Sequence, residues 1–277
     1  MRIGYKTDVG KTRELDEDSI GIFHIDFINK SIKGEKFLLV VADGLGGHNA
    51  GEIASGLAVN KVAEEIIGSI MRKDHMNLTS GEIKDIIQKA VKRASRDIFK
   101  LAEKNPQYKG MGTTLTIALV IDSTVHIGHV GDSRAYIVNK NEILQITKDH
   151  SLTQELVDKG EITKEEARIH LLKDIITKAV GVYKEPEVDI YRAHIYRDDF
   201  LLLCSDGLTD MLSEEEIHAT FMQNDDPKTI CDVLVQKAND KGGQDNISMI
   251  VAQFDELAAR EWYGNIMSRM LYFTIFN

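Results

Sequence analysis

The pattern of apolar and polar positions divides the chain into strand-like and helix-like stretches. Residues 20–27 and 37–42 are predicted to form two strands, joined by the polar link 29–35. The second of these is apolar throughout, as in a strand that is covered on both faces. From about Ala50 the apolar residues follow a helical spacing, and a second helical pattern begins after Ser80, which stands where an N-cap would.

Strand patterns return after Asn105-Pro106, a pair that is expected to end the second helix. Two hairpins, two buried strands and two helices are predicted: strands 113–121 with 124–130, strands 134–138 with 143–146, strands 200–204 and 247–254, and helices near 213–222 and 227–240. Residues 147–180 are polar and helix-like, without a clear apolar stripe. Two long helices in tandem among runs of strands indicate α+β layers rather than alternating βαβ units.

The end of the chain has a different pattern from the rest. We predict one domain over residues 1–254 and an apolar C-terminal helical tail over 255–277, because apolar residues recur there at helical spacing. The tail is expected to pack on its own domain, with a partner protein, a second copy or a membrane surface as alternatives. The membrane alternative is the weakest, since Arg260 and Arg269 are the only basic residues of this stretch.

Composition and charge narrow the class of protein. The 277 residues are 43% hydrophobic and 28% charged and include only three prolines, which excludes collagen-like and disordered chains. A net charge of −10 disfavours nucleic-acid binding. We find no signal peptide and no apolar run near the ~20 residues of a membrane span. Two cysteines, Cys204 and Cys231, do not make a disulfide scaffold, so a cytoplasmic protein is expected.

Aspartates recur at the ends of the predicted apolar strands. Asp43, Asp132 and Asp206 follow strands, and Asp245 precedes one. A single aspartate of this kind is an ordinary turn residue. However, strands of a sheet can bring their ends together, and converging carboxylates repel one another unless a cation neutralises them. Oxygen ligands without His or Cys suit Mg²⁺ or Mn²⁺, so the pattern predicts a hydrolase with two ions ~3.5–4 Å apart.

A basic residue precedes a further pair of acids. Arg13 stands four and five residues before Glu17 and Asp18. A guanidinium beside a dimetal centre can bind a phosphate through two parallel hydrogen bonds. The residues themselves therefore indicate the hydrolysis of a phosphate ester.

The same motifs resemble a known family. The matching stretches, in the order of the family, are 7–10, 13–18, 41–48, 112–114, 130–136, 147–151, 201–210 and 245–248. Together they resemble the bacterial metal-dependent serine/threonine protein phosphatases of the PPM, or type 2C, family. The resemblance implies an α+β fold, a four-layer α-β-β-α sandwich of two antiparallel sheets flanked by helices. It also implies hydrolysis of phosphoserine and phosphothreonine monoesters in proteins by metal-activated water.

The resemblance further implies that Mn²⁺ or Mg²⁺ is held by carboxylates and one carbonyl. The ligands would be Asp43 bridging two ions, Asp206 and Asp245 at the first site, and the Gly44 carbonyl with either Glu17 or Asp18 at the second. Asp132 with Asp206 matches a third, weaker site. Arg13 matches the arginine that binds the substrate phosphate, and Asn246 resembles a residue that orients the neighbouring ligand.

Residues 147–180 resemble the flap beside the active site of this family, and they depart from its usual pattern. Leu171 replaces a usual proline and Lys178 a usual arginine, while Asp16, outside the flap, replaces a usual asparagine. The resemblance therefore leaves the substrate preference open.

Two other functions are compatible with these residues. One is a phosphatase that acts on a small phosphorylated metabolite, and the other is a non-catalytic partner-binding module of the same fold. The complete set of expected carboxylates argues against the second. The expected partners are phosphorylated proteins, modified by an opposing Ser/Thr kinase, with neither nucleic acid nor a membrane among them.

Overall fold

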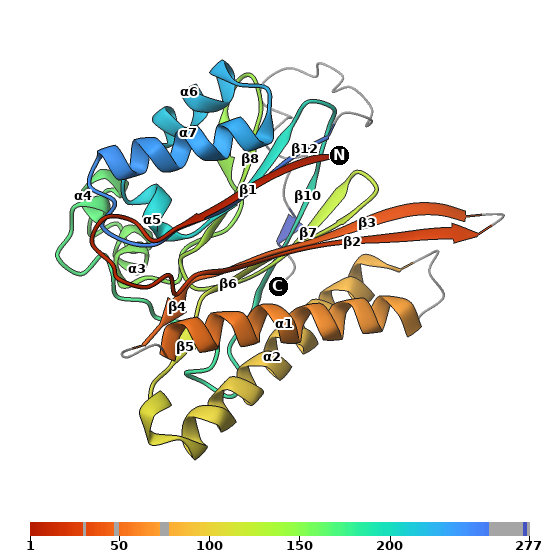
Figure 1. The fold of residues 1–277 in the computed structure, drawn as a ribbon, viewed down its shortest axis with the longest axis horizontal. Coiled ribbons are helices and arrows are strands. Elements are labelled where there is room, and N and C mark those ends of the chain that lie inside the picture. The colour runs from red at the N-terminus through yellow and green to blue at the C-terminus, as the bar shows by residue number, and fades with distance from the viewer. Residues whose placement is uncertain (30–31, 47–49, 73–77, 255–273, 276–277) are drawn as a thin grey trace.

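The computed structural model describes residues 1–29, 32–46, 50–72, 78–254 and 274–275 as stacked layers (Figure 1). Two sheets lie face to face, with a pair of long helices outside one sheet and a second pair outside the other. The layers hold three clusters of buried apolar side chains, one between the sheets and one beneath each helix pair. This arrangement confirms the α+β sandwich that the resemblance implies.

One antiparallel sheet has six strands in the order β13-β10-β7-β6-β3-β2. Its strands are β2 (Ser19–Asn29), β3 (Ile32–Ala42), β6 (Leu115–Ile121), β7 (Thr124–Val130), β10 (Asp189–His194) and β13 (Thr274–Ile275). The alternation of side chains explains why the last six residues of β3, 37–42, are apolar throughout. Leu38 and Val40 face the helices, whereas Leu39 and Val41 face the other sheet.

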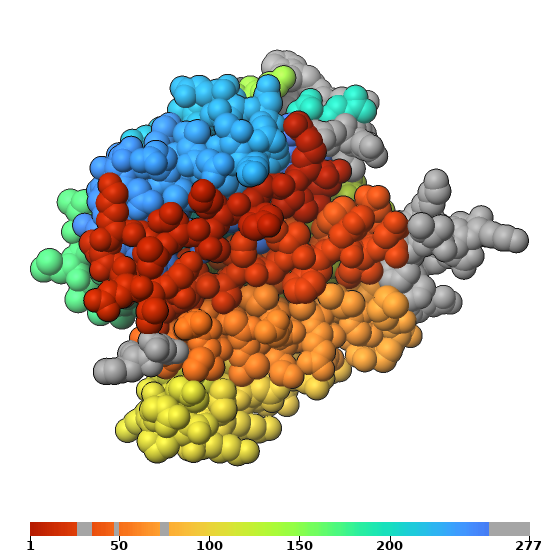
Figure 2. Space-filling view, viewed as in Figure 1, coloured from red at the N-terminus to blue at the C-terminus, as the bar shows by residue number. Residues whose placement is uncertain are grey.

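The second antiparallel sheet has five strands in the order β1-β12-β11-β8-β9. These strands are β1 (Arg2–Asp8), β8 (Arg134–Val138), β9 (Ile143–Gln145), β11 (Phe200–Cys204) and β12 (Ile247–Gln253). A short pair, β4 (Gly44–Leu45) and β5 (Gly112–Thr113), continues beyond the end of β3. Figure 2 shows the N-terminal segment with β1, in red, running along the surface between the orange α1 and the blue C-terminal helices.

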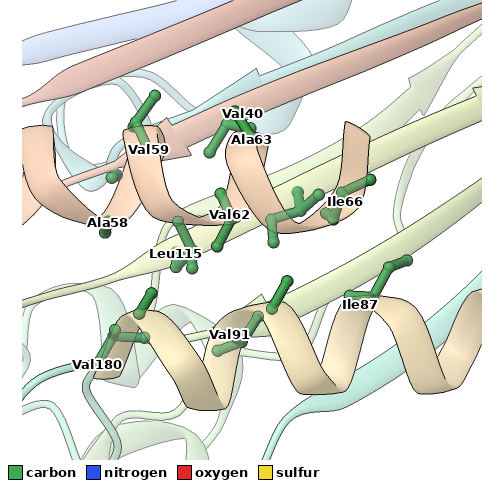
Figure 3. Packing of buried hydrophobic residues seen from close by; sticks show 14 of the residues in the cluster. Val40, Ala58, Val59, Val62, Ala63, Ile66, Ile87, Val91, Leu115 and Val180 are labelled. Atoms are coloured by element: carbon green, nitrogen blue, oxygen red, sulfur yellow. The ribbon is translucent and has the colours of Figure 1, made fainter. Parts of the chain in front are cut away.

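Four long helices and several short ones cover the sheets. They are α1 (Ala50–Arg72) and α2 (Ser80–Lys104) on the six-stranded sheet, α6 (Glu214–Gln223) and α7 (Pro227–Asp240) on the five-stranded sheet, and the short helices α3 (Leu152–Asp158), α4 (Lys164–Arg168), α5 (Asp206–Thr209) and 3₁₀ helix η1 (Pro106–Tyr108). Figure 3 shows Val62 and Ile66 of α1 and Val91 of α2 packed with Leu115 of β6. None of the helices in the described ranges is long and apolar enough to cross a membrane.

Several local details differ from the prediction. The link predicted over 29–35 is shorter, since β2 runs to Asn29 and β3 begins at Ile32. Only α3 and α4 are helical within the helix-like stretch 147–180. The N-cap of α2 is Thr79 rather than Ser80, because the Thr79 hydroxyl accepts from the Glu82 amide while the Glu82 carboxylate accepts from the Thr79 amide. Strands β1 and β10 were not predicted, since both carry polar residues among their apolar ones. Each is fixed by a neighbouring strand, β1 by β12 and β10 by β7.

The predicted C-terminal tail lies almost entirely outside the described residues. Within it the structure describes only Thr274–Ile275, which form β13 and pair with Tyr191 and Arg192 on β10. The helical prediction for the rest of 255–277, and its expected packing, stay predictions.

Candidate active site

Strands from both sheets end at one edge of the sandwich, and their ends carry the predicted aspartates. Asp43 follows β3, Asp206 follows β11 and Asp245 precedes β12. They open into a cleft of about 410 Å³. The predicted residues in its lining are Arg13, Glu17, Asp43, Gly44, Asp206, Asp245 and Asn246. The structure thus brings together residues that are separated by more than two hundred positions in the sequence.

Asp43 lies among other negative charges in this cleft. Its burial, and then the charges of four other aspartates, raise its pKa well above the ordinary value. These neighbours are Asp18, Asp206, Asp132 and Asp245. Because like charges in a low-dielectric site repel strongly, the cluster favours a bound cation or protons.

A second hollow of about 290 Å³ adjoins the first and shares Asp206 with it. Asp132 lines only this second hollow, with 7% of its side chain exposed. Burial and the charge of Asp206 raise its pKa well above the ordinary value. Burial, with Asp210 and Asp245, likewise raises the pKa of Asp206 to about 7. Asp132 therefore belongs to the same acidic cluster but approaches it from the opposite side.

Glu17 and Asp18, which the resemblance does not separate, occupy different places. The Glu17 side chain lines the cleft. Asp18 is buried behind it, and its Oδ2 accepts a hydrogen bond from the Ser205 hydroxyl at 2.8 Å. Glu17 can therefore contact a ligand in the cleft directly. Asp18 instead holds Ser205, the residue that precedes Asp206.

Arg13 and Asn246 tie the N-terminal loop to the rest of the cleft. The Arg13 Nη2 lies 2.7 Å from Asp245 Oδ2, and its side chain is half exposed. The Asn246 Nδ2 donates to the carbonyls of Val9 and Leu15, and its Oδ1 accepts from the Glu17 amide at 2.9 Å. One side chain therefore fixes the loop that carries Arg13 and Glu17.

The backbone around Asp43 is held by hydroxyl groups that the sequence analysis did not single out. The Asp43 amide donates to Thr114 Oγ1 at 2.9 Å, and the Asp43 carbonyl accepts from the Thr114 amide at 2.8 Å. The Thr114 hydroxyl also bonds to that of Ser133 at 2.7 Å. Ser133 follows Asp132, so this contact joins the two acidic loops. Both residues lie in stretches that match the family motifs, 112–114 and 130–136, and this match was the sequence signal that could have pointed to them.

Glycine at position 44 is required by close backbone contacts. A Cβ built at Gly44 would lie 2.4 Å from the carbonyl oxygens of Glu17 and Gly51. The chain can therefore turn from β3 into the cleft only with glycine there, which leaves the peptide groups beside Asp43 in the cleft lining.

The donor set fits a hard divalent cation. It consists of carboxylates and carbonyls without thiolate or imidazole, and buried oxygens of Asp18, Asp132 and Asp206 have no hydrogen-bond partner. Among the described residues, no three acidic, histidine or cysteine side chains already form a closed ligand set. The carboxylates thus surround the cleft without forming a closed ligand set among the described residues.

Comparison with known proteins shows which family the chain belongs to. The family model described as protein phosphatase 2C matches residues 19–225. The chain belongs to the protein phosphatase 2C family. It is 37% identical to the serine/threonine phosphatase stp of Listeria monocytogenes over 255 residues, covering 92% of this chain and 96% of that protein. It is also 34% identical to protein phosphatase PhpP of Streptococcus pneumoniae, covering 92% and 98%.

Solved structures agree with this assignment. The fold matches a bacterial serine phosphatase with a TM-score of 0.80 and 35% identity, over 95% of this chain and all of the other. It also matches the catalytic domain of the serine threonine protein phosphatase PstP in complex with two manganese ions, with a TM-score of 0.74 and 32% identity, over 92% and 98%. Family membership makes this chain a metal-dependent serine/threonine protein phosphatase, as the resemblance implied.

Proposed function

We propose that this phosphatase hydrolyses phosphoserine and phosphothreonine in proteins at the cleft that contains Asp43. The observation that carries the proposal is the convergence of four other aspartates on Asp43, in the cleft that Arg13 also lines. Such a cluster is stable when cations neutralise it, and the family uses divalent ions. When bound, Mn²⁺ or Mg²⁺ lowers the pKa of water and offsets the charge of the phosphate.

Each residue has a place in this proposal. Asp43 would hold two ions, with Asp206 and Asp245 on one side and the Gly44 carbonyl with Glu17 on the other. The choice of Glu17 over Asp18 rests on its position in the cleft lining, because Asp18 accepts from Ser205. Asp132 with Asp206 would hold a third, weaker ion from the adjoining hollow.

Arg13 would orient the substrate. Its guanidinium is anchored by one bond to Asp245, and half of the side chain remains exposed to the cleft. A second edge of the guanidinium can therefore donate to the phosphate oxygens. Asn246 would keep this loop in place by holding the carbonyls of Val9 and Leu15.

The proposal also covers partners and organisation. The substrates would be cytoplasmic proteins that a Ser/Thr kinase has phosphorylated. Residues 1–254 would form the catalytic domain, and the tail 255–277 would contact the domain, a partner or a second copy without taking part in catalysis.

The test compares a phosphothreonine peptide with small phosphorylated metabolites, in EDTA and after Mn²⁺ is added back. We expect turnover of the peptide only with Mn²⁺, at a higher kcat/KM than any small ester. The variant Asp43→Asn should lose this turnover. Asp97→Asn on α2, which makes the same chemical change away from the cleft, is its matched control. Turnover that persists in EDTA after dialysis would contradict the metal-based mechanism, and a preference for metabolites would favour the alternative substrate class.

A further inference from the structure

The turn that follows α4 has apolar side chains where a surface normally has polar ones. Ile169 is 85% exposed and Leu171 98%, and Leu172 and Ile175 are 41% and 44% exposed. We name these four residues the aliphatic patch. Single exposed aliphatic residues are common, but four within seven positions form a concentrated apolar surface, and such surfaces mark binding sites.

The cations of the same segment bond to residues at the end of α5. The Lys173 ammonium forms an ion pair with Asp210, at the end of α5, and only 29% of its side chain is exposed. The Arg168 Nη2 donates to the Thr209 carbonyl at 3.4 Å. The two charged residues therefore fix the segment to the core, and the apolar residues are left facing solvent.

Backbone bonds hold the turn in this arrangement. The Lys173 amide donates to the His170 carbonyl and the Ile175 amide to the Leu172 carbonyl, both at 3.2 Å. The Ile175 carbonyl in turn accepts from the Leu152 amide at 2.9 Å, which joins the turn to α3. The exposure of the patch is thus part of a hydrogen-bonded structure.

Sequence neighbours of the patch line the catalytic cleft. Lys173, Asp174 and Ile176, which lie within or directly beside it in the sequence, line the cleft that contains Asp43. Figure 1 shows α3, α4 and α5 at the same end of the molecule as β4. A peptide residue spans ~3.3 Å, so residues one to three positions from a phosphoresidue in the cleft lie up to ~10 Å away, at this rim.

We propose that the aliphatic patch binds apolar side chains that flank the phosphorylated residue of the substrate protein. This inference rests on the proposed function and adds a substrate class to it. Charge favours a peptide over an anionic membrane as the occupant. Residues 159–175 hold four basic and four acidic residues, whereas a membrane-binding surface has an excess of basic ones.

The experiment uses two phosphothreonine peptides that differ only in having leucine or serine at the two positions on each side of the phosphoresidue. The enzyme is the full chain with Mn²⁺, as the wild type and as the double variant Ile169→Ser/Leu171→Ser. The matched control is Met71→Ser/Met222→Ser, which removes exposed apolar side chains from α1 and α6. Hydrolysis of p-nitrophenyl phosphate reports on the metal centre separately.

We expect the wild type to prefer the leucine peptide by about tenfold in kcat/KM, mainly through KM, as for other differences in apolar burial. The double variant should lower this ratio to near one, while the control variant keeps it. Equal rates for the two peptides with the wild type, or a ratio that survives in the double variant, would overturn the inference. A different occupant would also overturn it. In that case the double variant, but not the control variant, would lose self-association or vesicle binding, while the ratio of kcat/KM between the two peptides would stay the same.

The proposed function fails in a different way. If neither peptide is hydrolysed while p-nitrophenyl phosphate is, then the enzyme does not act on phosphoproteins, and both proposals fall. If both peptides are hydrolysed equally, only the patch is refuted.

Discussion

Two carboxylates of this phosphatase have opposite surroundings. Glu65 on α1 is 3% exposed, and Lys89, Arg93 and Arg72 surround it, with Lys89 Nζ at 2.8 Å. The hydrogen bond from Lys89, helped by Arg93, lowers the pKa of Glu65 below its ordinary value. Asp43 is only partly exposed, but its neighbours are aspartates, and desolvation together with their charges raises its pKa.

The difference shows how a structural carboxylate can be told from a functional one. Desolvation alone does not separate them, because it acts to raise the pKa of both side chains. The sign of the neighbouring charges does. Glu65 is neutralised by the protein itself and joins α1 to α2, whereas Asp43 belongs to a cluster that the protein leaves negative and that therefore favours a bound cation.

The largest expected effect comes from Asp43→Asn. Turnover should fall by about 10³-fold or more, since one residue would serve two ions. In EDTA, however, the variant should be at least as stable as the wild type, because a charge that four neighbouring aspartates repel has been removed. Thermal unfolding in EDTA and turnover in Mn²⁺ measure the two effects. A large loss of stability in EDTA would show that Asp43 is structural, as Glu65 is.

Arg13→Ala tests the cation that forms an ion pair with Asp245 in the cleft. A charge-assisted hydrogen bond contributes ~1.5–3 kcal/mol, so KM for a phosphopeptide should rise by about 10- to 150-fold, with a smaller change in kcat. Arg96→Ala on α2 is the matched control and should leave KM unchanged. An unchanged KM in the Arg13 variant would place this residue outside the substrate site.

Glu65→Gln tests the other half of the comparison. Losing the charge leaves three cations around a neutral amide, so the free energy of unfolding should fall by about 1–2 kcal/mol. Turnover per folded molecule should not change. Glu64→Gln, on the exposed side of α1, should change stability by less than ~0.5 kcal/mol. A loss of turnover in the folded Glu65 variant would show that α1 is coupled to the cleft.

The pH dependence of stability should have opposite signs at the two places. The pKa of Glu65 is lowered, so its contribution is present above its ordinary value of 4.5 and is lost as pH falls through the folded-state pKa. The pKa of Asp206 is raised to about 7 from 3.8, so in EDTA its charge destabilises the fold at pH 8. That penalty should disappear as pH falls from 7 toward 4. Denaturation of Glu65→Gln and Asp206→Asn at several pH values, each against the wild type, checks both signs.

The sequence by itself determined the elements and the chemistry. Apolar periodicity located the long helices and the buried strands, because burial on one or two faces imposes that spacing. Aspartates after β3, β7 and β11 indicated hard-cation chemistry, and the matched motifs identified the family. The sequence pattern did not predict β1 and β10, because both mix polar and apolar residues. Each becomes a strand through hydrogen bonds to a neighbour, β1 to β12 and β10 to β7.

Only the tertiary structure decided which of these residues meet and in what surroundings. Glu17 and Asp18 are adjacent in the sequence, yet one faces the cleft and the other binds Ser205. The bond between Thr114 and Ser133 and the three cations around Glu65 join separate segments. Charge and burial depend on distances in space, and the sequence pattern fixes such distances only within one helix or strand.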